Sequence, residues 1–137
     1  MIDFDLLEKD KDLISDEFLT NSPFEHIIID NFCNEQKLND AIALIPDAQN
    51  AGHKKSNDYI FAKNKFEKSD FDLLCPQLSE LKSELLSDRF STWLSEITQQ
   101  KIFIDPDFHG GGIHQGGRGS FLDMHADFNY HPQNRSW

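Results

Sequence analysis

Glycine is distributed very unevenly along this chain, because six of its seven glycines fall between residues 110 and 119. Before this stretch, apolar side chains recur mostly at helical spacing, and after it comes a short apolar run at 119–128. Glycine weakens helices and permits a close approach of backbones, so the stretch separates two kinds of structure. This order of segments along the chain predicts an α+β fold in which helices come first and core strands begin near residue 101.

Two helices are predicted before residue 50. Residues 3–20 form an acidic, amphipathic segment with irregular spacing. Residues 34–46 carry apolar side chains on one helical face, with Asn34 as the N-cap and Pro46 as the stop.

Two further helices are predicted between residues 71 and 98. A stripe of Phe and Leu at 71–85 is interrupted by Pro76, so we expect the helix to begin near that proline, where the first turn tolerates it. A second stripe at 90–97 has Asp88 as a possible cap. Neither stripe lasts for three heptads, which favours packing within the domain over a coiled coil with a partner.

Strands are expected where β-branched and aromatic residues cluster between turn residues. The run Ile27, Ile28 and Ile29 follows a proline and predicts a buried strand. Residues 47–57 are polar and predict a loop. The predicted strands are 22–32, 58–62, 101–105, 112–115 and 119–128.

Length and charge limit the classes of function. A chain of 137 residues is long enough for one domain with its own core. Its formal net charge of −11 would repel phosphate backbones and anionic membrane surfaces, so we expect neither nucleic acid nor membrane as a partner. An acidic N-terminus does not resemble a secretory signal, and the two cysteines form no CxxC pattern, which predicts a cytoplasmic protein with reduced thiols.

The glycine-rich stretch does not match the common glycine motifs of active sites. The sequence HGGG at 109–112 is similar to an oxyanion loop, but the chain has no G-x-S-x-G nucleophile elbow. A phosphate loop would require a following lysine, and the G-x-G-x-x-G spacing is also absent. We therefore interpret the stretch as a loop or hairpin beside a site.

His125 and Asp127 stand two residues apart in the last predicted strand. Alternate residues of a strand point to one face, so the imidazole and the carboxylate could bind one ion together. They are two of the three donors of the facial triad that holds Fe(II) and leaves other positions open. The pair alone is a weak signal, because a surface histidine and an aspartate at a strand end would give the same tripeptide.

The surrounding sequence, GGIHQGGRGSFLDMHADFNYHP at 111–132, resembles the iron-binding segment of the 2-oxoglutarate/Fe(II)-dependent oxygenases, in the prolyl 4-hydroxylase-like group. The segment SPFEHIIIDNF at 22–32 resembles the N-terminal strand of that group, and STWLSEIT at 91–98 resembles the helix before its first barrel strands. The resemblance spans about residues 22–135 and is specific at 112–132.

The resemblance implies N-terminal helices packed on the first strands of a double-stranded β-helix, or jelly roll, which is truncated here. Residues 1–137 would then be a single incomplete domain, with a helical support region at 1–100 and the first core strands at 101–137. The implied reaction hydroxylates a prolyl residue in a protein, or a proline-like small molecule. It consumes O2 and 2-oxoglutarate, releases succinate and CO2, and uses Fe(II), with ascorbate as an optional addition.

By the same resemblance, His125 and Asp127 are the first two iron ligands. The family's third histidine and its basic residue for 2-oxoglutarate would follow Trp137, so we expect the chain to be a fragment that is inactive and poorly stable alone. His131 is better interpreted as a turn residue, His114 lies at most near the site, and neither Arg118 nor Arg135 matches the basic position. The other histidines, taken as ordinary polar residues, are His26, His53 and His109.

Two alternatives remain beside the oxygenase: a non-enzymatic acidic α+β binding domain, and a degenerate oxygenase relative that keeps the front half of the fold as a scaffold. The coding sequence after Trp137 separates them from the oxygenase. An in-frame continuation with a later histidine, and an arginine or lysine about ten residues beyond it, would support the enzyme.

For such an extended protein, we predict succinate release that depends on Fe(II) and 2-oxoglutarate. His125→Ala and Asp127→Ala should each abolish it, because each removes an iron donor. Unchanged turnover in both variants would show that the ligand assignment is wrong.

Overall fold

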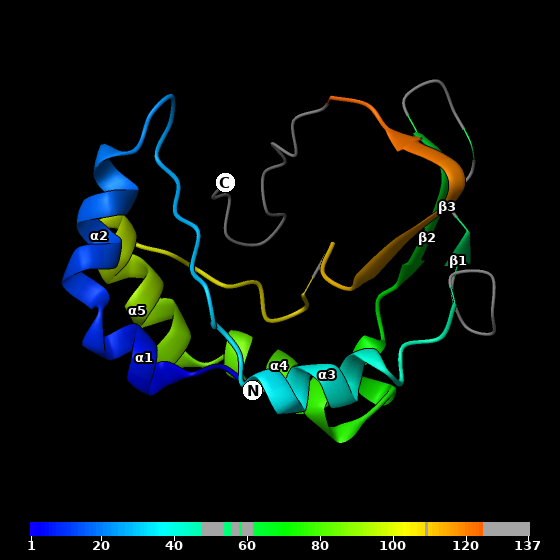
Figure 1. Cartoon of the computed structure of the whole chain (residues 1–137), viewed down its shortest axis with the longest axis horizontal. Helices are drawn as coiled ribbons and strands as arrows, with labels where there is room; N and C mark the ends of the chain where they lie inside the picture. The colour runs from blue at the N-terminus through cyan, green and yellow to red at the C-terminus, as the bar shows by residue number, and fades with distance from the viewer. Residues whose placement is uncertain (48–53, 56–57, 59–61, 109, 125–137) are drawn as a thin grey trace. The chain divides into compact units, whose positions relative to one another are not determined.

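The computed structural model describes residues 1–47, 54–55, 58, 62–108 and 110–124. The chain divides into a helical unit, Met1–Pro46 with Ser69–Gly112, and a strand unit, Asp47–Lys68 with Ile113–Trp137 (Figure 1). The expected mixture of helices and strands is confirmed. The described residues contain a sheet of three strands, so the jelly roll stays a prediction, and so does a single domain over 1–137.

The predicted helical segment at 3–20 is confirmed, but it forms two helices. Helix α1 spans Phe4–Lys9 and helix α2 spans Lys11–Thr20. Asp10 ends the first helix and precedes the second. The backbone N–H of Leu6 donates to the Asp3 carboxylate at 3.0 Å, which caps the start of α1.

Helix α3 spans Glu35–Ile42 and begins as predicted. The side-chain oxygen of Asn34 accepts a hydrogen bond from the Lys37 backbone N–H at 3.0 Å, which confirms the N-cap. The helix ends four residues before Pro46, and the chain continues through a turn in which the Leu44 N–H donates to the Ala41 carbonyl.

Helix α4 spans Pro76–Leu85, which confirms the predicted start at the proline. A short 3₁₀ helix, η1, at Phe71–Leu73 precedes it and contains the first residues of the apolar stripe at 71–85. The two helical pieces meet at Cys75, whose backbone is extended.

Helix α5 spans Asp88–Thr98, and its cap corrects the prediction. Ser87, rather than Asp88, has the extended backbone of an N-cap, and its hydroxyl oxygen accepts from the Phe90 N–H at 3.2 Å. Asp88 is the first helical residue, where its negative charge favours the helix N-terminus.

The core of the helical unit forms where α5 packs on the first two helices, and α2 and α5 lie side by side in Figure 1. Leu7 is fully buried, and Trp93 and Ile97 are each 2% exposed. The Trp93 Nε1–H donates to the Leu7 carbonyl at 3.3 Å, so the indole keeps a polar partner inside the core. The buried cluster consists of Ile2, Leu7, Ile14, Phe90, Trp93 and Ile97.

Two predicted strands of this unit, 22–32 and 101–105, are wrong, because neither range forms a strand. In the isoleucine run, Ile27 and Ile29 pack against the core cluster, whereas Ile28 is 82% exposed. The burial of this run alternates although its sequence does not, so every second side chain covers the core without the segment joining a ladder; β-branched composition favours a strand but supplies no pairing partner.

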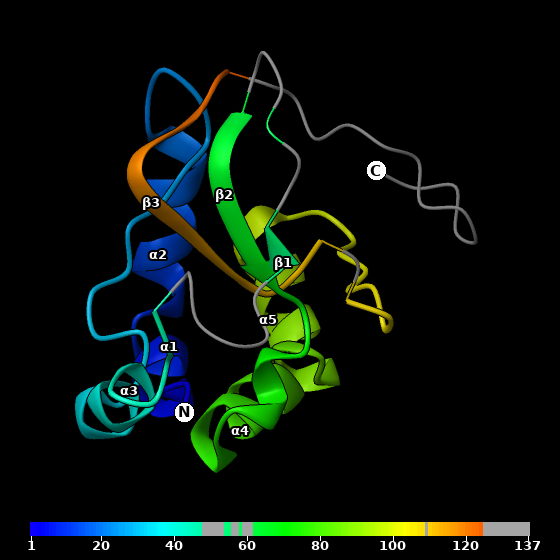
Figure 2. The same cartoon turned by 90° about the vertical axis from the view of Figure 1, so that its right-hand side faces the viewer.

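The strand unit is an antiparallel sheet in the order β1-β2-β3, with β1 at Lys54–Lys55, β2 at Ala62–Lys68 and β3 at Ile113–Leu122 (Figure 2). The strand predicted at 58–62 coincides with β2 only at Ala62, and residues 59–61 lie outside the described ranges. Strand β3 confirms the strand expected at 112–115 and continues to Leu122. Of the strand expected at 119–128, residues 119–122 belong to β3, residues 123–124 do not, and residues 125–128 lie outside the described ranges.

The glycine-rich stretch divides into two parts: residues 110–112 precede β3 in a non-strand segment, and the later glycines lie within β3, where the strand bulges. Lys63 pairs with Phe121 and Lys65 pairs with Gly116, so residues 117–120 of β3 lie opposite the single residue Asn64. Asn64 has a left-handed backbone with φ 54°, and its side-chain amide donates to the Arg118 carbonyl at 3.2 Å. A Cβ at Gly117 would lie 2.6 Å from that amide nitrogen, so a larger residue there would displace the Asn64 side chain from its hydrogen bond with Arg118.

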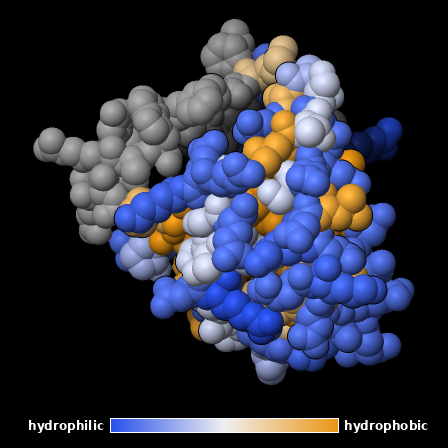
Figure 3. All heavy atoms as spheres, turned by 90° about the vertical axis from the view of Figure 1, so that its left-hand side faces the viewer, coloured by the Kyte–Doolittle hydropathy of each residue, from blue (hydrophilic) through white to orange (hydrophobic). Residues whose placement is uncertain are grey.

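The face of the molecule in Figure 3 is largely hydrophilic, with scattered apolar patches. The sequence of the helical unit contains 19 acidic and 6 basic residues, so the acidity of the chain is concentrated in that unit. Within the described ranges, no helix is both long and apolar enough to cross a bilayer.

The packing around Leu7 predicts a large effect of truncation. Leu7→Ala should lower the free energy of unfolding by about 2–5 kcal/mol, because it removes a fully buried side chain and leaves a cavity. Leu13→Ala is the matched control, since Leu13 is 60% exposed, and should change stability by less than about 0.5 kcal/mol. Urea denaturation followed by Trp fluorescence measures both, and equal effects would contradict the assigned core.

Candidate functional site

The predicted iron ligands, His125 and Asp127, lie outside the described residues, as do His131 and Arg135. Their roles therefore stay predictions. The structure describes the strand that precedes them, since β3 continues to Leu122 in an antiparallel pair with β2.

The two described candidates of the strand unit are both exposed. His114 lies on β3 opposite Glu67, and Arg118 lies in the bulge. Across the part of the chain that the structure describes, no three His, Cys, Asp or Glu side chains gather into a group that could hold a metal ion.

The remaining histidines were predicted to be ordinary polar residues. His26 fits this, since its Nδ1 lies 2.8 Å from the Phe24 carbonyl oxygen and its ring contacts the Phe24 ring. His53 and His109 lie outside the described ranges.

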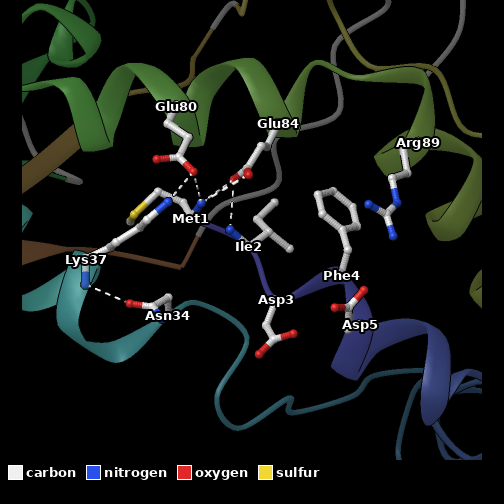
Figure 4. A pocket seen from close by; sticks show the side chains of 10 residues that line it. All are labelled: Met1, Ile2, Asp3, Phe4, Asp5, Asn34, Lys37, Glu80, Glu84 and Arg89. Carbon is white, nitrogen blue, oxygen red and sulfur yellow. Dashed lines mark hydrogen bonds and ion pairs between the residues drawn. The ribbon is translucent and has the colours of Figure 1, made fainter.

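A pocket of about 370 Å³ opens beside the chain's first residues, within the helical unit (Figure 4). It is rich in charged side chains from the N-terminal segment, α3, α4 and the start of α5. Its lining residues are Met1, Ile2, Asp3, Phe4, Asp5, Asn34, Lys37, Glu80, Glu84 and Arg89.

The α-ammonium group of Met1 is held by two carboxylates of α4. It donates to Glu80 Oε1 at 2.6 Å and to Glu84 Oε1 at 3.0 Å. The Ile2 backbone N–H donates to the second oxygen of Glu84 at 2.8 Å. Met1 and Ile2 are 3% and 7% exposed, so the ammonium and its neighbouring peptide are withdrawn from water.

Backbone hydrogen bonds hold the same segment from its other side. The Asp3 N–H donates to the Phe32 carbonyl at 2.9 Å, and the Asn34 N–H donates to the Met1 carbonyl at 2.8 Å. Ile2 and Cys33 thus form an isolated antiparallel bridge. Four hydrogen-bonding groups at residues 1–3 have fixed partners, which positions the terminus on α4.

Lys37 joins the cluster from α3. Its Nζ lies 2.7 Å from Glu80 Oε1, and this hydrogen bond, followed by the one from the Met1 ammonium, lowers the pKa of the Glu80 carboxyl. The same contact raises the pKa of Lys37. At the other end of the pocket, the Arg89 guanidinium lies 4.1 Å from the centre of the Phe4 ring, in a cation–π contact.

The charged side chains that line this pocket pair with one another, and they do not form a nucleophile–base arrangement. Glu80 and Glu84 are already engaged by cations, and none of its lining residues is a serine, cysteine or histidine that could act as a nucleophile with a base. Sequence reasoning missed the cluster. The available signal was the spacing of Glu80 and Glu84, which places two carboxylates on one face of a helix.

Both cysteines are free, in agreement with the predicted thiols. Burial raises the pKa of the Cys33 thiol, and Cys75 is buried at the start of α4. A raised thiol pKa lowers the reactive thiolate fraction, so Cys33 is poorly suited to be a nucleophile.

No family model, no curated protein and no solved structure matches this chain.

The lowered pKa of Glu80 predicts acid sensitivity of the helical unit. Because the folded-state pKa lies below the ordinary value, the carboxylate contributes stability above that ordinary value and loses it as pH falls through the folded-state pKa. Glu80→Gln should therefore weaken the decrease in stability below about pH 4.5. Denaturation at pH 7, 5, 4 and 3 measures the slope. Glu25→Gln, at an exposed site, is the control and should keep the wild-type slope.

Proposed function

We propose that this chain belongs to an Fe(II)- and 2-oxoglutarate-dependent dioxygenase that hydroxylates a prolyl residue or a proline-like small molecule. The observation that carries the proposal is the segment at 111–132, in which a glycine-rich stretch and an apolar strand lead into His125 and Asp127. The proposal places the reaction in the cytoplasm and includes O2 and 2-oxoglutarate as co-substrates, with ascorbate as an added reductant.

The described strands are compatible with this proposal. A jelly roll is built from antiparallel strands, and β3 pairs antiparallel with β2 in the residues that precede the proposed ligands. The bulge at 117–120 is also of a kind found near active sites, where it redirects a strand.

The donor chemistry fits Fe(II), because one imidazole nitrogen and one carboxylate oxygen are two members of the facial triad. When bound, the iron supplies the oxidation of a C–H bond with O2 and 2-oxoglutarate. The chain's own contribution is to orient two donors on one side of the ion. The described residues contain no complete group of three donors, so we assign neither the third ligand nor a basic residue for 2-oxoglutarate.

The test of the proposal is metal binding by the 137-residue chain. We expect weak binding of Fe(II) under anaerobic conditions, measured by isothermal titration calorimetry, with Co(II) as a redox-stable probe. His125→Ala and Asp127→Ala should each weaken the affinity at least about tenfold, which corresponds to about 1.4 kcal/mol of binding free energy.

His26→Ala is the matched control, since His26 is a histidine that the structure places in a local contact with Phe24. It should leave the affinity unchanged. If both ligand variants bind the metal as well as the wild type does, the proposed iron site is wrong.

A non-enzymatic binding domain is the second candidate, and one observation favours it. Phe24 and Ile28 are 68% and 82% exposed in a segment whose composition is that of a buried strand. Exposed large apolar side chains often contribute to partner contacts. Absence of metal binding in the same titration would favour this candidate over the oxygenase.

A further inference from the structure

We propose that one face of the sheet in the strand unit, the face that carries Lys63 and Lys65, is a docking surface for an acidic segment of a partner protein. Arg118, in the neighbouring bulge, and the Phe121 ring contribute further contacts. The proposal is independent of the iron site, because it rests on described residues that precede His125.

The first observation is the charge of the sheet. Its three strands contain six basic residues and one acidic residue, Glu67, so their formal charge is +5 in a chain whose net charge is −11. Strand β2 supplies three of the lysines and lies between β1 and β3 (Figure 2). A local positive surface on an acidic protein attracts anionic groups and steers them to one place.

The second observation is that Lys63 and Lys65 lie on the face of β2 opposite its buried residues. They alternate with Ala62 and Phe66, which are 2% and 8% exposed. Successive residues of a strand point to opposite faces, so the apolar pair covers one face of the sheet and the two lysines project from the other. A molecule that lies on this second face can therefore contact both ammonium groups.

The cross-strand neighbours of the two lysines are not acidic. Lys63 pairs with Phe121, which is 47% exposed, and Lys65 pairs with Gly116, which has no side chain. Paired residues share a face of the sheet, so the ring stands beside the Lys63 ammonium group. Arg118 is exposed in the bulge between these two pairs. Three cationic groups thus lie within a short stretch of the ladder, next to one apolar ring.

The third observation is that none of these three cations has an ion pair among the described residues. In the helical unit, by contrast, Lys11, Lys37 and Lys82 each bind a carboxylate at 2.7 or 2.8 Å. Asp58 approaches β2 between the two lysines, where its carboxylate accepts the Asn64 backbone N–H at 2.7 Å. It offsets one of the three positive charges, and the others stay available to a partner.

These features favour a protein segment with carboxylates over a nucleic acid. Duplex DNA presents a charge about every 1.7 Å, and binding strengthens with each phosphate that the protein neutralises. Three cations neutralise few phosphates, and the helical unit, with 19 acidic and 6 basic residues in its sequence, repels the others. A short segment with a few carboxylates can pair with the same cations through charge-assisted hydrogen bonds, while an apolar side chain in it covers Phe121.

The experiment titrates the full 137-residue chain into a short fluorescein-labelled peptide in which glutamate alternates with leucine. Fluorescence anisotropy in about 50 mM salt measures binding, and about 300 mM salt should weaken it at least about fivefold because charges are then screened. The Lys63→Gln, Lys65→Gln double variant should bind at least about tenfold more weakly.

The matched control is the Lys9→Gln, Lys101→Gln double variant, which removes two charges from exposed positions of the helical unit. It should change the affinity by less than about twofold, because these charges lie outside the docking surface. No binding of the acidic peptide, or equal weakening by both double variants, would overturn the proposal.

A further pair of variants tests the apolar contact. Phe121→Ala should weaken peptide binding at least about threefold, whereas Phe103→Ala should leave it unchanged. Phe103 is the matched control, since it is 59% exposed and belongs to the helical unit. Tighter binding of a single-stranded oligonucleotide of the same charge would also overturn the proposal, because the face would then be a nucleic-acid surface.

Discussion

The contact between one face of α5 and the first two helices is the interaction on which the helical unit depends. Trp93 and Ile97 are buried against Leu7, and the indole N–H donates to the Leu7 carbonyl across 86 positions of sequence. Neither α1 nor α2 is long enough to be stable in isolation, so their helicity relies on this shared apolar surface. The docked N-terminal segment extends the same core, because Ile2 is one of its members.

Helix boundaries were predictable where they depend on neighbouring residues. Asn34 caps α3 and Pro76 begins α4 because capping and proline geometry act within one turn. The choice between Ser87 and Asp88 was harder, since both residue types cap helices and only the extended backbone at Ser87 decides it.

Strands were less predictable than helices, because a strand forms only by pairing with another strand, and its own sequence does not show which segment that is. The isoleucine run at 27–29 has a strand-like composition and covers helices instead, whereas β2 has a polar, lysine-rich sequence and forms a strand through pairing with β3.

The two candidate sites differ in how they can be inferred. His125 and Asp127 stand close together in sequence, so their spacing is itself the signal, and the fold adds only the strand that leads to them. The Met1 cluster has the opposite character, since its ammonium and Glu80 are 79 positions apart. Only the folded backbone joins them.

The charge of the chain is distributed unevenly between the two units. The acidity that argues against nucleic acid belongs to the helical unit, while the strand unit has seven basic and five acidic residues in its sequence.

The helical unit is discontinuous, since the chain leaves it after Pro46 and returns at Ser69. This has a consequence for biosynthesis. A ribosome adds about 5–20 residues each second, so the first two helices emerge several seconds before the helix that completes their core has been translated. During that interval the apolar side chains of α1 and α2 have no native surface to cover them, and the nascent chain would present them to chaperones. Acidic residues, which are abundant in this early part of the chain, would help to keep it dispersed until α5 leaves the exit tunnel.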